Sequence, residues 1–343
     1  MKMNRNRPIR KQKGVALLVV LLLLAVMTAI AATMSERLVL GVDRATSQVS
    51  NQQAYWYAIG VEALAKYGIN ESLDDSDTVN LSQAWALDEQ VYPLENGEAK
   101  GVIRDMQACF NVNALANVQI DPTSSSRPYL LGVWRTLLEE VGIESYQAEV
   151  IADSTWEYLD SNDGVTTQTG VEDATYEGLS PAYMASNGLI ADISELRSVY
   201  QMDAAGMRRI SWLACAIPTD DLRINVNTIR VWQSKILVAL FQEAISDDQA
   251  KQILEDRPYD GWENIDEFLA EPAINAIDAT VRDNAKQYLS VDSRYFELDA
   301  EIYVQDSRVR LRSLLHSENE DEARVVRRRF GGISERSPDS SAE

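Results

Sequence analysis

The strongest concentration of chemically useful side chains lies in the stretch 156–173, which reads WEYLDSNDGVTTQTGVED. Its oxygen donors fall into two groups, Asp160, Asn162 and Asp163 and then Glu172 and Asp173. Calcium takes roughly six to eight oxygen ligands from carboxylates, amides and backbone carbonyls, and a loop that folds the second group back onto the first would supply them. The glycine and glutamate stand one position away from their places in an EF-hand, so a solvated acidic turn is the alternative.

Few other reactive side chains are present. The chain has one histidine, His316, and two cysteines, Cys109 and Cys215, too few for zinc fingers, iron–sulfur clusters or a histidine-dependent triad. No P-loop, HExxH or nucleophile-elbow motif occurs. Acidic dipeptides such as Asp74-Asp75 are typical of a solvated surface rather than of opposed catalytic carboxylates. The sequence therefore predicts a protein that is not an enzyme, and a carboxylate-based hydrolase is the enzymatic alternative.

The chain is strongly acidic, and its charge is unevenly distributed. It has 343 residues, with 32 Lys and Arg against 53 Asp and Glu, which gives a formal net charge of −21. Six of the basic residues and none of the acidic ones fall in residues 1–14, so the rest of the chain carries 26 basic against 53 acidic residues, or −27. This acidity excludes a nucleic-acid partner, because phosphate binding needs a basic surface.

Residues 15–34 follow this basic leader and contain no charged side chain. At about 1.5 Å per residue, a helix of this length spans roughly 30 Å, the thickness of a bilayer's hydrocarbon core. The positive-inside rule then places residues 1–14 in the cytoplasm and the chain after residue 34 on the other side. A secretory signal peptide is the alternative, although the apolar stretch is long for one and no small-residue cleavage site follows it.

Helical periodicity continues over residues 35–70, where apolar side chains recur at steps of three and four with one gap at Gln52. These side chains are Leu38, Val42, Ala45, Val49, Trp56, Ile59, Ala63 and Tyr67. A continuous helix from Val15 to Tyr67 would be about 80 Å long. We expect its first part to lie in lipid and the apolar face of its second part to pack against a globular domain.

The rest of the chain separates into a small body that contains strands and a helical insert. Residues 295–304 alternate between apolar and polar side chains, which predicts a half-buried antiparallel strand. Further strand candidates are residues 101–110, 308–315 and 323–330. The predicted division is a body formed by residues 71–110 and 291–330, an inserted helical domain at 111–290, and a disordered tail at 331–343.

One short pattern occurs twice at the start of helical stretches. The string FNVN at residues 110–113 is echoed by INVN at residues 224–227. The helical stretches that follow are residues 130–141 and 146–159 in the first copy, and 231–244 and 247–254 in the second. Asparagines in such a position can cap or brace a turn before a helix. The echo indicates a diverged duplication, and a chance match of a short string is the alternative.

The N-terminal pattern resembles that of type IV pilins and pseudopilins, and KQKGVALLVVLLLLAVMT at residues 11–28 resembles the minor pseudopilin K family of type II secretion systems. The resemblance implies that a prepilin peptidase cleaves after Gly14 and that the new terminal amine, on Val15, is methylated. The class normally has a glutamate at the fifth mature position, where this chain has Val19. The missing glutamate fits a subunit at the filament tip, which has no subunit above it whose amine needs neutralising.

The resemblance extends over nearly the whole chain, including INVNT at residues 224–228. It implies an α+β fold, with a type IV pilin-like long N-terminal helix plus an antiparallel sheet and a large inserted all-α domain. It also implies calcium as the cofactor. The family's acidic loop, W-x-x-x-D-x-x-D followed by G-x-E-D, is matched by Trp156, Asp160, Asp163, Gly170, Glu172 and Asp173. Asn162 inside the loop and Asn187 after it are further ligand candidates.

A periplasmic location would give the two cysteines an oxidising environment. Their even number then fits one disulfide, Cys109 with Cys215, which would tie the two echoing segments together. A crosslink that closes a loop of about 100 residues is worth up to about 4–5 kcal/mol in the chain-entropy model. Two buried free thiols are the alternative.

In function, the resemblance implies a minor pseudopilin at the tip of the type II secretion pseudopilus, which initiates assembly for export of folded proteins across the outer membrane. It implies a single span in the cell inner membrane and a C-terminal domain in the periplasm. The implied partners are other minor pseudopilins, the major pseudopilin and prepilin peptidase, while contact with the secretin or with exported protein is left open. The alternative is a membrane-anchored periplasmic hydrolase or a single-pass adaptor with a calcium-stabilised domain.

Overall fold

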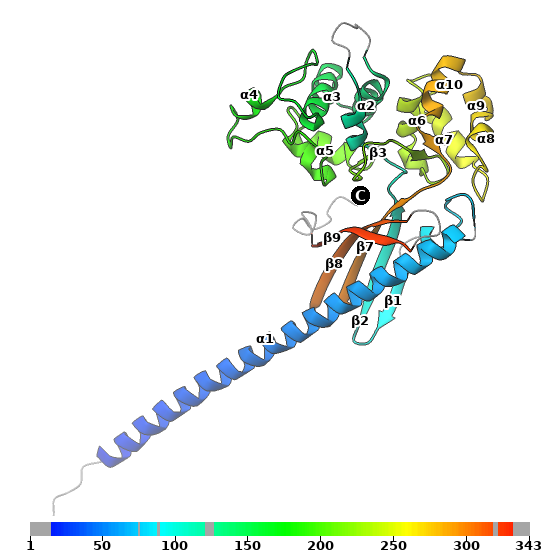
Figure 1. Ribbon diagram of the computed structural model, residues 1–343. Coiled ribbons are helices and arrows are strands. Elements are labelled where there is room, and N and C mark those ends of the chain that lie inside the picture. The colour runs from blue at the N-terminus through cyan, green and yellow to red at the C-terminus, as the bar shows by residue number, and fades with distance from the viewer. Residues whose placement is uncertain (1–14, 75, 88–89, 121–126, 318–321, 332–343) are drawn as a thin grey trace, which may run out of the picture.

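A computed structural model describes residues 15–74, 76–87, 90–120, 127–317 and 322–331. It has a long N-terminal helix, an antiparallel sheet packed along the second half of that helix, and a helical domain beyond one end of the sheet (Figure 1). The predicted leader, residues 1–14 with Gly14, and all but the first residue of the predicted tail lie outside the described residues.

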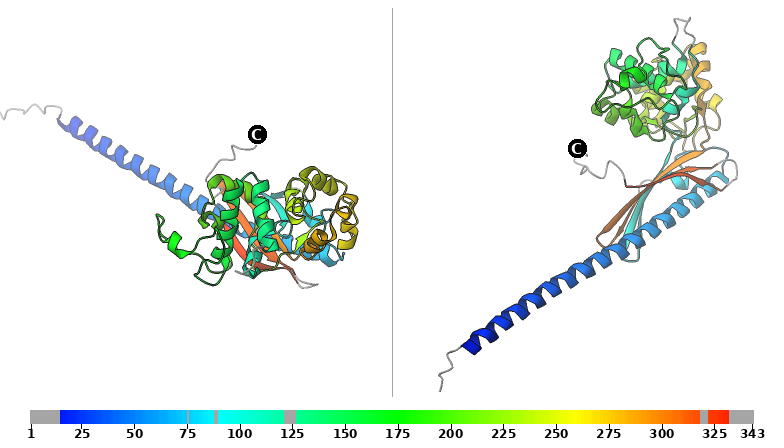
Figure 2. Two further views of the ribbon diagram at one scale, coloured as in Figure 1. Left: turned by 90° about the horizontal axis from the view of Figure 1, so that it is seen from above. Right: turned by 60° about the vertical axis from the view of Figure 1, so that its left-hand side comes forward.

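Helix α1 (Val15–Asp74) is a continuous helix of 60 residues, about 90 Å long at 1.5 Å per residue. Its first half extends away from the rest of the protein (Figures 1 and 2). This part is long and apolar enough to cross a membrane, and none of it is buried inside the protein. An apolar surface on all sides of a helix is stable in lipid rather than in water, so the prediction of a membrane span over residues 15–34 agrees with the structure.

The face of α1 that packs against the sheet differs from the predicted one. Its buried residues are mostly small, namely Ser50, Ala54, Ala58, Glu62, Ala65, Ile69 and Ser72. On the predicted face, Val49, Trp56 and Tyr67 are instead 63%, 68% and 63% exposed. The prediction that this apolar face packs against the body was therefore wrong. Small side chains let the helix approach the sheet closely, whereas the bulky ones point away from it.

The sheet has the strand order β1-β2-β7-β8-β9, and all neighbouring strands are antiparallel. The strands are β1 (Gln90–Leu94), β2 (Gly97–Asp105), β7 (Tyr295–Val304), β8 (Ser307–His316) and β9 (Arg324–Phe330). Strand β2 pairs with β7 over its full length, so the helical domain is inserted between two adjacent strands. The last three predicted strands are confirmed, β2 ends five residues before its predicted end, and β1 is a strand that the sequence did not predict.

One core joins the sheet to α1. The predicted apolar face of β7 is buried, from Phe296 to Val304, and it packs against Ala54, Ala58 and Ile69 of the helix. A polar contact adds to this core. The buried Glu62 carboxylate accepts hydrogen bonds from Arg328 Nε at 2.8 Å, from Arg328 Nη2 at 2.5 Å and from Ser313.

The helical domain has the following elements. Its helices are α2 (Tyr129–Glu140), α3 (Ser145–Leu159), α4 (Asp173–Tyr176), α5 (Ala204–Ile210), α6 (Lys235–Leu240), α7 (Asp247–Glu255), α8 (Ile265–Leu269), α9 (Pro272–Asn275) and α10 (Ala279–Lys286). Its short 3₁₀ turns are η2 (Val112–Asn117), η3 (Ile193–Ser198) and η4 (Val231–Gln233), and η1 (Ala84–Ala86) lies in the body. The predicted helix over 231–244 is divided into η4 and α6 and ends early, because Gln242 and Glu243 have positive φ angles of 51° and 61°.

The two asparagine strings make equivalent contacts. The side-chain oxygen of the first asparagine accepts the backbone N–H of the second in both copies. In the first copy, the Asn113 side chain donates its amide to Ile190 O and accepts the N–H of Ile190. In the second copy, Asn227 makes the same two hydrogen bonds with Trp262. Each string also starts a short parallel pair, β3 (Phe110–Asn111) with β4 (Ala214–Cys215) and β5 (Ile224–Asn225) with β6 (Leu289–Ser290). Such shared contacts support duplication over a chance match.

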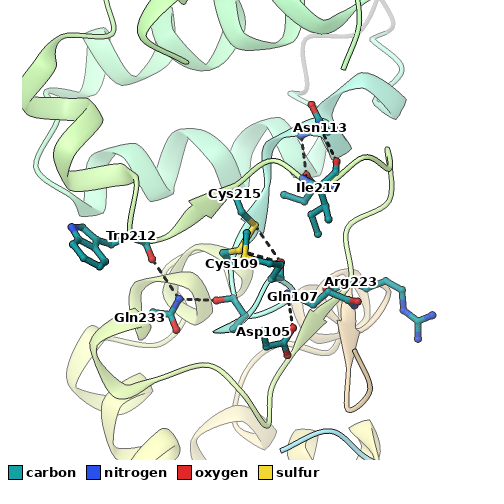
Figure 3. Close-up of a disulfide and its surroundings, with 12 residues drawn as sticks. Asp105, Gln107, Cys109, Asn113, Trp212, Cys215, Ile217, Arg223 and Gln233 are labelled. Carbon is teal, nitrogen blue, oxygen red and sulfur yellow. Dashed lines mark hydrogen bonds between the residues drawn. A yellow bond between two sulfur atoms is a disulfide. The ribbon is translucent and has the colours of Figure 1, made fainter. Parts of the chain in front are cut away.

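The body and the helical domain meet at the disulfide and at Asp105 (Figure 3). Cys109 and Cys215 are bonded, with an S–S distance of 2.11 Å, which confirms the predicted pairing. The buried Asp105 carboxylate accepts hydrogen bonds from Ser293 Oγ and Thr228 Oγ1, both at 2.5 Å, and from Gln107 N at 2.7 Å. Burial raises the pKa of Asp105 to about 6, although these hydrogen bonds act to lower it.

Candidate metal site

The predicted acidic loop begins at the end of α3 and returns to it at α4. Asp160 directly follows the last residue of α3, and Glu172 is the N-cap of α4, where its carboxylate accepts the N–H of Asp173 at 3.3 Å. An acid is favourable at the N-terminus of α4, because free N–H groups and the positive end of the helix dipole lie there, but Asp160 stands at the C-terminus of α3, where it gains nothing from the dipole. The end of α3 and the start of α4 thus place two carboxylates at the two ends of one loop.

Three carboxylates converge at this point. Glu157, Asp160 and Glu172 each have a carboxylate oxygen within 4.8 Å of the others. All three side chains are buried, with 0%, 8% and 3% of their surface exposed. Burying several carboxylates together without a cation is unfavourable, because they lose hydration and repel one another.

Three buried acceptors, one on α3, one at the N-cap of α4 and one after α4, have no hydrogen-bond donor in the described part of the chain. Glu157 Oε2, Glu172 Oε1 and Asn187 Oδ1 are buried and make no hydrogen bond within the described residues. The other Glu157 oxygen accepts three, from Thr166 N at 2.8 Å and from Thr167 N and Oγ1 at 2.6 Å each. The loop thus fixes one oxygen of Glu157 and leaves the other available to a ligand.

The pKa values in this cluster reflect its burial and charge. Burial, with some repulsion from Glu157 and Asp163, raises the pKa of Asp160 to about 6. Burial and then repulsion from Asp160 and Glu157 raise the pKa of Glu172 to about 7. A cluster that resists ionisation in this way is satisfied by a bound cation, and an all-oxygen donor set favours a hard one such as Ca²⁺.

The structure separates the predicted ligands into two sets. Asp160 and Glu172 belong to the cluster. Asn162 is exposed and donates its side-chain amide to Asp160. Asp163 is also exposed and accepts a hydrogen bond from Asn187 Nδ2 at 2.7 Å. Asp173 accepts the N–H of Ala185 at 2.7 Å. These three side chains brace the loop instead of joining the cluster.

Glu157 is the cluster member that the sequence prediction did not name. It lies three residues before Asp160, and this helical spacing puts two side chains on the same face. The spacing was visible in the sequence, but it could not show that the second half of the loop returns to the same point.

Gly170 lets the loop pass close to α3. A Cβ atom added there would lie 2.3 Å from Thr167 Oγ1, 2.8 Å from Glu157 Cγ and 3.0 Å from the backbone of Asp153. Ordinary side chains cannot approach so closely, so glycine at this position is what allows Glu172 to reach Glu157.

Known proteins match the chain along most of its length. Two family models, both described as "Type II secretion system (T2SS), protein K", match residues 108–219 and 224–292, one for each copy of the asparagine string. The protein named Type II secretion system protein K from Aeromonas hydrophila is 36% identical over 94% of this chain and 98% of its own length. The protein of the same name from Klebsiella pneumoniae is 34% identical over 94% of this chain and 97% of its own.

A solved structure is similar as well. One chain of the crystal structure of the GspK-GspI-GspJ complex from the enterotoxigenic Escherichia coli type 2 secretion system matches with a TM-score of 0.77 and 38% identity. The match covers 84% of this chain and 99% of that one. The predicted α+β architecture, with a long N-terminal helix, an antiparallel sheet and a helical insert, is therefore confirmed.

Proposed function

Because this chain belongs to the type II secretion system protein K family, we propose that it is the tip subunit of a type II secretion pseudopilus, where it initiates assembly with other minor pseudopilins. The observation that carries the proposal is the sequence match over almost the full length of named relatives. Family membership supports a minor pseudopilin, a structural component of protein secretion, and does not support an anchored hydrolase or adaptor.

Tip position follows from the chemistry of the N-terminus. Cleavage after Gly14 would leave Val15 as the terminal residue and Val19 at the fifth position, where the class has a glutamate. Without that carboxylate the subunit cannot neutralise the terminal amine of a subunit above it, and at the tip no such amine exists. In this proposal α1 anchors the chain in the inner membrane, and the sheet and helical domain lie in the periplasm.

The exposed face of α1 supports a helical partner. Trp56, Leu64 and Tyr67 lie on the periplasmic half of the helix and are 68%, 55% and 63% exposed. A bulky apolar face next to a membrane span is most stable when another helix covers it. In the proposed assembly this covering helix belongs to another minor pseudopilin, and the major pseudopilin extends the filament below.

We propose calcium as the cation of the carboxylate cluster. Glu157, Asp160 and Glu172 would hold it, and the bound charge would offset their mutual repulsion and close the loop between α3 and α4. The unpartnered buried oxygens of Glu157 and Glu172 support this role.

Processing tests the tip proposal. Full-length chain is expressed in cells with and without prepilin peptidase, and its N-terminus is determined by mass spectrometry. We expect loss of residues 1–14 and a methylated Val15 only where the peptidase is present. Co-purification of other minor pseudopilins should fall with Trp56→Ala/Tyr67→Ala and stay unchanged with Asn51→Ala, a polar exposed position on the same helix. Retention of residues 1–14 in wild-type cells would refute the proposal.

Thermal unfolding tests the calcium site. Calcium at pH 8 should raise the melting temperature of the purified full-length protein relative to EGTA. Glu157→Gln with Glu172→Gln should remove this rise. Asp248→Asn should keep it, because the Asp248 side chain is 97% exposed and lies outside the cluster. An equal rise in wild type and double variant would place the ion elsewhere, and no rise in wild type would exclude calcium.

A further inference from the structure

Large apolar side chains gather where α1 meets the last strand of the sheet. Tyr55 contacts Trp56 of the same helix and Phe330 of β9, with ring centroids 5.4 Å and 5.0 Å apart. Tyr55 is 38% exposed, Trp56 68% and Phe330 44%. Val326, which projects from the same face of β9 as Phe330, is 45% exposed. We call these four residues the α1–β9 surface. Exposed aromatic and aliphatic side chains that lie together in this way are typical of an interface.

Strand β9 follows one flank of α1 in the opposite direction. The residue before the strand, Ala323, donates its N–H to Asn70 Oδ1 of the helix at 3.0 Å. The last residue of the strand, Phe330, contacts Tyr55. From Tyr55 to Asn70 the helix rises by about 22 Å at 1.5 Å per residue. The two elements therefore lie side by side over this length, and the apolar side chains of the strand continue the apolar side of the helix.

The charges within the α1–β9 surface are paired with each other. Arg328 projects from the same face of β9 as Phe330, and the buried Glu62 carboxylate accepts hydrogen bonds from its guanidinium. One row of α1 side chains at steps of four begins at this surface, and its members are Tyr55, Ile59 and Ala63. Ala63 is exposed and small, which allows another element to approach α1 closely.

A helix fits the α1–β9 surface better than an added strand does. Strand β9 is the last in the sheet order, so no other described strand pairs with its outer edge. Four of its seven residues are arginines, and charged side chains on an edge strand oppose the addition of another strand. The exposed apolar side chains come from both α1 and β9. An amphipathic helix can cover such a surface with its apolar face.

We propose that the N-terminal helix of another minor pseudopilin packs on the α1–β9 surface, with its apolar side chains against Tyr55, Trp56, Val326 and Phe330. The proposal rests on the assembly function given above, which requires a helix to cover α1, and it fixes the side of α1 on which that helix lies. The exposed apolar side of α1 continues from here into the half that is apolar enough to cross a membrane. A helix on this surface and parallel to α1 therefore continues into the same membrane.

Co-purification tests which side of α1 is covered. The full-length chain is expressed together with other minor pseudopilins and purified from membranes in detergent. We expect Phe330→Ala to reduce co-purification of these proteins at least fivefold, and Phe330→Leu, which keeps a large apolar side chain, to retain it. Tyr92→Ala is the matched control and should change nothing, because Tyr92 is 45% exposed on β1, at the opposite edge of the sheet. The melting temperature shows that each variant folds.

Crosslinking identifies what lies on the surface. With photoreactive benzoylphenylalanine in place of Val326, mass spectrometry should find crosslinks to the N-terminal helix of another minor pseudopilin. The same residue in place of Tyr92 should give none. These crosslinks decide the question if Phe330→Ala does not fold.

Two kinds of outcome separate this proposal from the assembly function. Normal co-purification by a folded Phe330→Ala variant would overturn the α1–β9 surface, and so would the absence of helix crosslinks from position 326. Normal co-purification by Trp56→Ala/Tyr67→Ala would instead refute the helical partner of the proposed assembly.

Discussion

Removing the disulfide gives the sharpest stability prediction. The perturbation is Cys109→Ala with Cys215→Ala, or reduction of the wild-type protein. The bond joins residues 106 positions apart, and in the chain-entropy model a crosslink of this span restricts the unfolded chain by about 5 kcal/mol. Both cysteines are buried beside Ile217 and Leu314, so the alanine pair also leaves a small cavity, whereas reduction keeps both sulfur atoms in the core. Most of the effect of reduction should therefore come from the unfolded state.

The assay is urea unfolding of purified full-length protein in detergent, oxidised and reduced. With a slope of about 2–3 kcal/mol per M, a loss of about 5 kcal/mol lowers the midpoint by roughly 2 M. The double alanine substitution should lower the midpoint at least as far as reduction of the wild type does, and reductant should have no effect on the variant. A midpoint that falls by less than about 0.3 M on reduction would contradict stabilisation through the unfolded chain. Free thiols found by alkylation of the unreduced protein would contradict the disulfide itself.

Three further predictions concern Asp105, Gly170 and Glu62. Because the folded pKa of Asp105 is raised to about 6 from an ordinary value of 3.8, its charge opposes folding above pH 6 and this cost disappears by about pH 4. Denaturant titrations should therefore show wild type gaining about 2 kcal/mol relative to Asp105→Asn when the pH is lowered from 7.5 to 4.5, and a constant difference would contradict this. Gly170→Ala should destabilise the protein by about 1–3 kcal/mol and weaken calcium binding measured by calorimetry. Gly188→Ala is the control and should change neither quantity, because a Cβ atom there would meet nothing closer than 3.8 Å. Burial alone would raise the pKa of Glu62, but hydrogen bonds from Arg328 and Ser313 lower it below its ordinary value of 4.5. Glu62→Gln should therefore lower the free energy of unfolding by about 2 kcal/mol near neutral pH, and by less as the pH falls below 4.5. In urea titrations, a loss of stability that does not depend on pH would count against this ion pair.

Local patterns predicted the elements well where one periodicity dominates. The strict alternation of β7 gave its limits and its buried face, because a strand with one face in a core must place every second side chain there. The uncharged run at the start of α1 likewise indicated a membrane span. The same reasoning missed β1, whose five residues include Pro93 and show no such alternation.

The candidate metal site was predicted in part. Asp160 and Glu172 stood out because the acidic residues of the loop are close in sequence, and the structure brings these two together with Glu157. Asn162, Asp163 and Asp173 belong to the same pattern, but they form hydrogen bonds with Asp160, Asn187 and the backbone of Ala185 respectively. Which acidic side chain points inward depends on the path of the loop, and sequence spacing does not specify that path.

The acidic charge, the apolar span, three strands of the sheet and the repeated asparagine string could all be read from the sequence, because these depend on residue types and short-range periodicity. Three features depend on tertiary packing: which face of α1 meets the sheet, that Glu157 joins the carboxylate cluster, and that Trp212 and Trp232 meet on the surface. These last facts join residues that are distant in sequence or depend on close approach between elements. The first two follow from how small residues such as Ala54 and Gly170 let the backbone pack closely, which a pattern of apolar and polar residues does not record.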